Sequence, residues 1–171
     1  MLWQCSRVNQ MATHQDVDSL DLATHAKACA LLLCDSFPDV KFTSGRRSIA
    51  QQAKAMAQNV VRNRRWIGET YRHGASLQGW IDRHPEVRAA SQIEAGLLAL
   101  MQNMKPEDLA KLSKHFTGMA FDLEPIVDHQ GLPTARGFEI VDFIRQHLQG
   151  AKVLLREGGL VVWHVQFDLE V

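Results

Sequence analysis

Two segments of the sequence carry side chains that commonly bind metal ions. Residues 113–122 (SKHFTGMAFD) place His115 and Asp122 seven positions apart, on either side of Gly118. Imidazole nitrogen and carboxylate oxygen are both zinc ligands, and a loop that runs into a strand can bring the two onto one ion. A catalytic zinc site also needs a third protein ligand and an open position for water, so another donor must come from elsewhere in the chain.

His164 is the candidate for this third ligand. It lies in the apolar segment 161–167 (VVWHVQF), where a histidine needs a polar partner. Taken singly, His164 has the alternative interpretation of a hydrogen-bonded core residue, and Asp122 that of a turn cap. The combination of His115, Asp122 and His164 predicts a metal site.

Two further elements accompany the segment 113–122. Residues 44–51 (SGRRSIAQ) precede it, and the pair 163–164 (WH) follows it. In this order, the three elements resemble the S-G-x-R-S-x-x-Q, S-x-H-x-x-G-x-A-x-D and W-H motifs of the D-alanyl-D-alanine metallopeptidases. The resemblance extends over residues 40–167, which is most of the chain.

The resemblance implies a fold and a metal centre. Members share the fold of a wider group that includes lysostaphin-like peptidases and the hedgehog signalling domain, in which a small antiparallel sheet carries the zinc and is flanked by helices. By this resemblance, His115, Asp122 and His164 bind one Zn²⁺ ion. Bound zinc lowers the pKa of its water towards ~7 and polarises a peptide carbonyl.

The same resemblance implies roles for residues around the metal. Arg47 binds a substrate carboxylate or stabilises charge at the scissile carbonyl, because a guanidinium offers two parallel donors. Ser113 and Gln51 are expected to contribute to substrate binding, and Ser113 also orders its loop by hydrogen bonding. Gly118 permits a close backbone turn.

The sequence departs from the family pattern at one catalytic position. Many members carry a carboxylate three residues before the last histidine, where it takes the proton from the attacking water. Val161 occupies this position here. Because valine cannot accept a proton, either another acid serves as the base or the protein binds zinc without cutting peptides.

We expect Glu157 to replace the missing carboxylate. A two-residue turn at positions 158–159 sets Glu157 opposite Leu160, and cross-strand partners have Cβ atoms about 4.5–5.5 Å apart. A bulged hairpin is needed to bring Glu157 close to His164, and a solvent-facing turn residue is the alternative interpretation. Weaker candidates for the base are Glu124 and Glu139.

The implied function is zinc-dependent hydrolysis of peptidoglycan stem peptides. The enzyme would be a phage endolysin-like endopeptidase or a D,D- or L,D-carboxypeptidase. The N-terminus lacks the pattern of a signal peptide, so we expect synthesis in the cytoplasm and action in the periplasm or cell wall after release by another route. The alternative is a non-catalytic zinc-binding relative that serves as a wall-binding or phage structural module, and Val161 is its main support.

Periodicity predicts the elements that position these residues. Helical spacing predicts helices over residues 16–36, 48–65, 86–104 and 134–148, and short helices and loops over 66–85. Strands are expected at residues 40–44, in a segment that ends at Leu123, and in a C-terminal hairpin whose two apolar runs flank Gly158 and Gly159. The predicted class is α+β, with a small antiparallel sheet carrying the zinc site and flanked by helices.

The composition agrees with one globular domain. A chain of 171 residues with 46% apolar and 22% charged residues can bury a single core. We expect one zinc peptidase domain at residues 16–171 after a loose N-terminal arm at 1–15. Nineteen basic residues balance nineteen acidic ones, so no overall field favours nucleic acid. No apolar run approaches the ~20 residues that span a bilayer, so we expect no membrane insertion.

Overall fold

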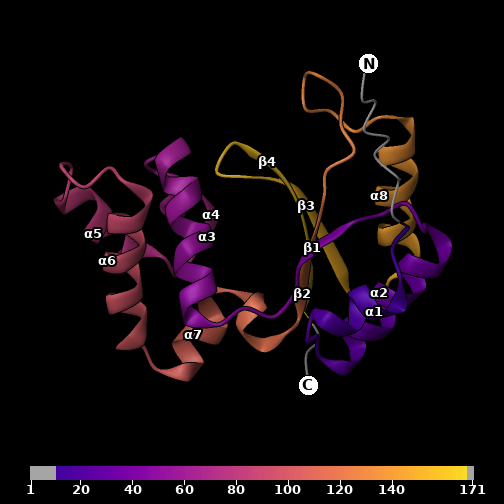
Figure 1. Cartoon of the computed structure of the whole chain (residues 1–171), viewed down its shortest axis with the longest axis horizontal. Helices are drawn as coiled ribbons and strands as arrows, with labels where there is room; N and C mark the ends of the chain where they lie inside the picture. The colour runs from indigo at the N-terminus through magenta and orange to yellow at the C-terminus, as the bar shows by residue number, and fades with distance from the viewer. Residues whose placement is uncertain (1–10, 169–171) are drawn as a thin grey trace, which may run out of the picture.

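The computed structural model describes residues 11–168, in which helices flank a four-stranded antiparallel sheet (Figure 1). The strands are β1 (Phe42–Ser44), β2 (Ala120–Leu123), β3 (Ala151–Glu157) and β4 (Leu160–Phe167). The helices are α1 (His14–Ser19), α2 (Thr24–Ser36), α3 (Ile49–Arg62), α4 (Trp66–Thr70), α5 (Ala75–Arg83), α6 (Ala90–Gln102), α7 (Pro106–Leu112), the 3₁₀ helix η1 (Lys114–Thr117) and α8 (Ala135–His147). The predicted α+β class is confirmed.

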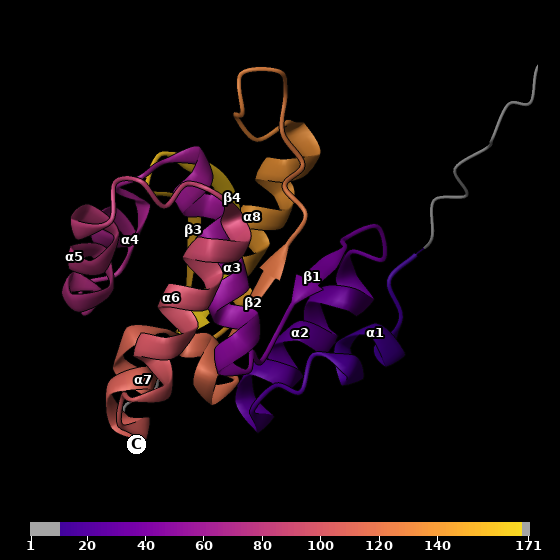
Figure 2. The ribbon, with the colours of Figure 1, turned by 60° about the vertical axis from the view of Figure 1, so that its left-hand side comes forward.

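The sheet order is β1-β2-β4-β3, with antiparallel pairing at each step. The two central strands, β2 and β4, come from distant parts of the chain and lie side by side. Helices α1, α2 and α8 cover one side of the sheet, and α3 to α7 lie on the other side (Figures 1 and 2). The central strands therefore have protein on both faces.

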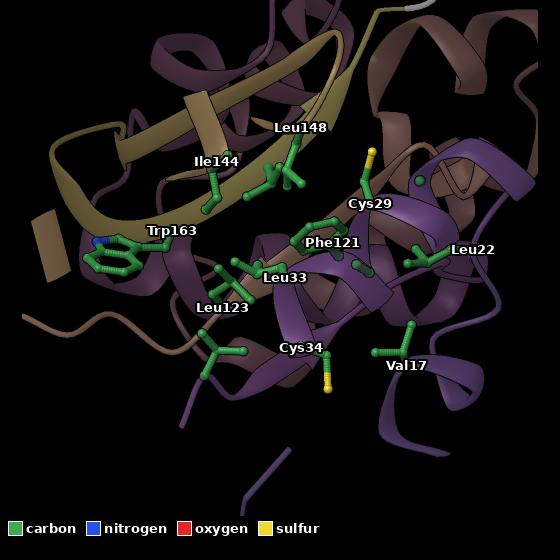
Figure 3. Packing of buried hydrophobic residues seen from close by; sticks show 14 of the residues in the cluster. Val17, Leu22, Cys29, Leu33, Cys34, Phe121, Leu123, Ile144, Leu148 and Trp163 are labelled. Carbon is green, nitrogen blue, oxygen red and sulfur yellow. The ribbon is translucent and has the colours of Figure 1, made fainter. Parts of the chain in front are cut away.

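Side chains of the central strands alternate between these two sides. Phe121 and Leu123 of β2, with Trp163, Val165 and Phe167 of β4, join a buried apolar cluster with α1, α2 and α8 (Figure 3). Because successive residues of a strand point to opposite faces, the even-numbered positions of both strands face α3 to α7.

A second apolar cluster holds α3 to α7 together. Met56, Trp66, Ile81 and Leu97 are among its fully buried side chains. Within residues 11–168 the two clusters share no buried residue. The even-numbered face of the sheet thus lies at the boundary between two separately packed cores.

The first predicted helix differs from the structure. The segment 16–36 forms two helices, α1 and α2, because Asp21 adopts a left-handed φ of 50° that interrupts the helical path. α1 begins at His14, capped by Thr13, so the last residues of the predicted arm at 1–15 are helical. Residues 1–10 of that arm lie outside the described part of the chain. Between residues 11 and 168, no helix is long and apolar enough to cross a membrane.

Candidate metal centre

The predicted metal ligands come from the two central strands and the turn before β2. Asp122 and His164 are direct cross-strand partners in the β2–β4 ladder. His115 lies in η1, which Ser113 caps and Gly118 ends with a φ of 72°. A Cβ atom at position 118 would lie 2.7 Å from the Arg46 guanidinium, so glycine suits both the conformation and the space. The chain therefore turns sharply between the first two ligands.

One potential ligand atom from each of the three residues lies within 4.8 Å of the others. The Nδ1 atom of His115 lies 2.6 Å from the carbonyl oxygen of Gly45 and donates to it, which leaves Nε2 free, 3.3 Å from Asp122 Oδ1. The Nδ1 atom of His164 lies 2.8 Å from the same Oδ1, while its Nε2 lies 3.2 Å from Gln166 Oε1. The donor set is Nε2 of His115, Oδ1 of Asp122 and Nδ1 of His164.

The electrostatics of the site favour a positive charge between the two rings. Burial opposes ionisation of Asp122, but the close contacts with His115 and His164 and the charge of Arg47 hold the pKa of its carboxyl well below the usual range. Burial lowers the pKa of His115. Burial acts in the same direction on His164, but the hydrogen bond and charge of Asp122 raise its pKa overall. The carboxylate is thus ionised beside two imidazoles, as metal coordination requires.

These residues can hold a metal ion. Each imidazole has one nitrogen occupied by a protein oxygen, which fixes the tautomer and aims the other nitrogen at Asp122. Outer partners of this kind are usual for metal-ligating histidines. His115 and His164 are both buried. Two nitrogens and one carboxylate oxygen fit a borderline-soft divalent cation such as zinc better than calcium or magnesium, which prefer oxygen ligands.

Arg47 contacts the second oxygen of Asp122. Its Nη2 atom donates to Asp122 Oδ2 and also lies 2.5 Å from Ser44 Oγ, which itself donates to Asp122 Oδ2 at 2.8 Å. The backbone amide of Arg47 donates to the carbonyl oxygen of His115 at 3.1 Å. Arg47 therefore lies beside the candidate metal ligands and holds the carboxylate of Asp122 in place.

The triad lies in a cavity of about 630 Å³ between the sheet and the α3–α7 layer. The lining includes all three ligands, Arg47 and Glu157. This volume accommodates a short peptide or a small molecule.

Glu157 reaches this cavity from the end of the hairpin. It pairs with Leu160 across a Gly158-Gly159 turn in which both glycines have positive φ, as the sequence predicted. The expected wider or bulged loop is absent from this hairpin, and the irregularity lies instead in the ladder, which shifts register between Leu154 and Arg156. Burial raises the pKa of Glu157. The side chain is half-buried and lines the cavity, in contrast to the alternative of a solvent-facing turn residue.

The α3–α7 layer holds the hairpin end in position. The Trp66 indole donates to the carbonyl oxygen of Glu157 at 2.9 Å, and the Asn63 amide donates to that of Gly158 at 2.8 Å. These bonds fix the backbone from which the Glu157 carboxylate projects.

The other predicted residues occupy different positions. Glu124 lies at the cavity lining but is exposed and paired with Lys41 at 3.0 Å. Glu139 is exposed on α8, paired with Arg136, and does not line the cavity. Ser113 lines the cavity and caps η1.

Gln51 is not among the residues that line this cavity, because its side chain caps the backbone of Ser48 at the start of α3. The next residue, Gln52, is fully buried and connects Arg47 to Tyr71. Sequence reasoning missed Gln52 and Tyr71 as site residues. For Tyr71 the signal was an aromatic residue in the glycine-rich segment after α3, and Gln52 directly follows the last position of the S-G-x-R-S-x-x-Q motif.

Comparisons of this chain with protein-family models, with curated proteins and with solved structures found no match. The triad, its outer partners and the cavity are therefore the basis for any functional conclusion, together with the sequence motifs.

Proposed function

We propose that this protein is a zinc-dependent peptidase that hydrolyses peptide bonds in peptidoglycan stem peptides. The observation that carries the proposal is the arrangement of His115, Asp122 and His164, whose ligand atoms lie within 4.8 Å of one another in a cavity that also contains Arg47 and Glu157. A purely structural zinc site is closed by four protein ligands, whereas a catalytic site keeps a position open. Three ligands at a cavity wall fit the catalytic type.

The residues of the chain divide the chemistry between them. Zn²⁺ held by the triad would lower the pKa of a water molecule and polarise the substrate carbonyl. Glu157 takes the proton from the attacking water and delivers it to the leaving amine, and its raised pKa makes it a stronger base than an ordinary carboxylate. Arg47 stabilises negative charge on the substrate while it orients Asp122.

The charge around the cavity supports an anionic peptide as substrate. Exposed Arg72, Lys111 and Lys152 line it. Two acidic side chains of the lining are already paired, Glu124 with Lys41 and Asp168 with Lys114. Stem peptides carry free carboxylates, which this excess of cations would attract.

Digestion of purified peptidoglycan tests the proposal. The zinc-loaded protein should release peptides, a chelator should stop the release, and added zinc should restore it. Mass spectrometry of the fragments identifies the bond and separates an endopeptidase from a carboxypeptidase. The matched control is His164→Ala, which removes one ligand and should release nothing. A zinc-loaded protein that leaves several wall types intact would contradict the proposal.

The second candidate is a non-catalytic zinc-binding module that binds cell-wall peptides or serves in a phage particle. Val161, at the position where many members of the resembled family carry the acid, favours it. The two candidates differ in one measurement, because Val161→Glu should confer cleavage on an inactive parent and change an active parent little.

A further inference from the structure

Arg47, Gln52 and Tyr71 form a chain of hydrogen bonds along the cavity wall. The Arg47 Nη1 atom lies 3.2 Å from Gln52 Oε1, and Gln52 Nε2 lies 2.9 Å from the Tyr71 hydroxyl oxygen. Gln52 has 0% of its surface exposed. A fully buried amide whose oxygen and nitrogen are both hydrogen-bonded has one stable orientation, so the hydrogen bonds from Arg47 to Tyr71 run in a defined direction.

The direction follows from the chemistry of the first member. A guanidinium has donors only, so Gln52 must present its oxygen to Arg47 and its NH₂ group to Tyr71. The hydroxyl oxygen of Tyr71 therefore accepts a hydrogen bond, and the hydroxyl proton remains to be donated. Within residues 11–168, that proton has no acceptor.

The position of Tyr71 places this unused donor at the metal-site cavity. Tyr71 lines the cavity with the triad, and its ring packs edge-on against Trp66 with centroids 5.3 Å apart. Burial raises the pKa of the Tyr71 hydroxyl, so it stays protonated at neutral pH. A neutral, oriented donor that faces a cavity can bind an oxygen atom of whatever enters it.

We propose that Tyr71 donates a hydrogen bond to the acyl oxygen of the peptide bond that is hydrolysed, and that Gln52 positions Tyr71 for this role. This inference rests on the proposed peptidase function. The tyrosine forms no covalent bond and transfers no proton. It stabilises the negative charge that develops on the oxygen, in addition to Arg47.

Removal of the hydroxyl is the first test. Tyr71→Phe should lower kcat by about 10²-fold, the usual cost of one lost donor to a developing oxyanion, with the zinc content unchanged. The control for loss of a hydroxyl is Ser36→Ala, because Ser36 donates to the carbonyl oxygen of Leu32 at 2.8 Å and does not line the cavity. Ser36→Ala should leave kcat unchanged. An unchanged kcat in Tyr71→Phe would overturn the proposal.

The second test keeps Tyr71 but reverses the hydrogen bond between its hydroxyl and residue 52. Gln52→Glu offers two acceptor oxygens, so Tyr71 would donate to position 52 and its proton would no longer face the cavity. We expect kcat to fall in Gln52→Glu, and the same substitution to have little further effect in the Tyr71→Phe background. An equal fall in both backgrounds would show that the new charge, and not the direction of the hydroxyl, is the cause, and would overturn the proposal.

A binding measurement separates this inference from the peptidase function. A phosphinate dipeptide carries tetrahedral oxygens that mimic the developing oxyanion and is not hydrolysed. The zinc-loaded parent should bind it at least about tenfold more tightly than zinc-loaded Tyr71→Phe does, as measured by calorimetry. Equal affinities would overturn the role of Tyr71, even if the parent cuts peptidoglycan. An inactive parent with the expected difference in affinity would instead refute the peptidase function and retain the donor.

Discussion

We expect the contact between Arg47 and Asp122 to make the stability of this protein depend on bound metal. The two side chains are only 16% and 22% exposed, so the pair is largely shielded from water. Replacement of Arg47 by methionine keeps most of the side-chain volume but removes the cation. The ionised Asp122 would then lack one of its counter-charges in the metal-free protein.

The size of the effect follows from the partners that remain. Loss of one partner of a buried ion pair costs ~3–5 kcal/mol of unfolding free energy. Ser44 and His164 still donate to Asp122 at 2.8 Å each, so we expect the lower end of this range. About 3 kcal/mol corresponds to roughly 6–12 °C in Tm for a chain of this size. With zinc bound, the metal compensates the carboxylate, and the loss should shrink to about 1 kcal/mol, the net value of an ordinary hydrogen bond.

Thermal unfolding followed by circular dichroism, with chelator and with saturating zinc, measures both values. Arg46→Met is the matched control, because Arg46 pairs with Asp21 at 2.9 Å, and neither residue is a metal ligand. Its Tm shift should be the same in both conditions. A shift for Arg47→Met that is equal with and without zinc would refute the argument that Arg47 balances the charge of a metal ligand.

Three further predictions concern the metal and the hairpin. The parent should bind one zinc ion per chain by elemental analysis, and His115→Ala or His164→Ala should lose it; full occupancy in either variant would exclude that ligand. Glu157→Gln should keep zinc but lower turnover by ~10²–10⁴-fold. Because burial raises the pKa of Glu157, the activity of the parent should fall with decreasing pH around a midpoint that lies above the pKa of an ordinary glutamate. Gly158→Ala should lower Tm and turnover together, since its Cβ would lie 2.3 Å from Trp66 and its φ is +50°, whereas unchanged turnover would mean that the position of the hairpin end does not matter.

Local patterns predicted most of the elements, and the three predicted ligands lie close enough together to hold a metal ion. The alternation of β2 and β4 is visible in the sequence, where apolar residues flank Asp122 and His164. Because the apolar residues face the core, both of these side chains must point to the opposite face of the sheet. The hairpin followed from two adjacent glycines, which accept the positive φ that a tight turn needs.

The structural features that the sequence did not predict depend on contacts between distant residues or on the backbone conformation of single residues. The break between α1 and α2 rests on one left-handed residue, Asp21, which helical periodicity does not reveal. Gln51 and Gln52 are neighbours in sequence but lie about 100° apart around a helix, so one caps α3 and the other points to Arg47. Only the packed structure distinguishes them.

The boundary between the two apolar clusters divides the site into two groups of residues. The metal ligands belong to the sheet and the turn before it, whereas Gln52 and Tyr71 belong to the layer of α3 to α7. Proteins open locally in cooperative units, and separately packed cores are natural units of this kind. A partial opening of α3 to α5 would displace Gln52 and Tyr71 and leave Asp122 and His164 in place on the sheet. Heat should therefore abolish the proposed peptidase activity at a lower temperature than it releases the metal.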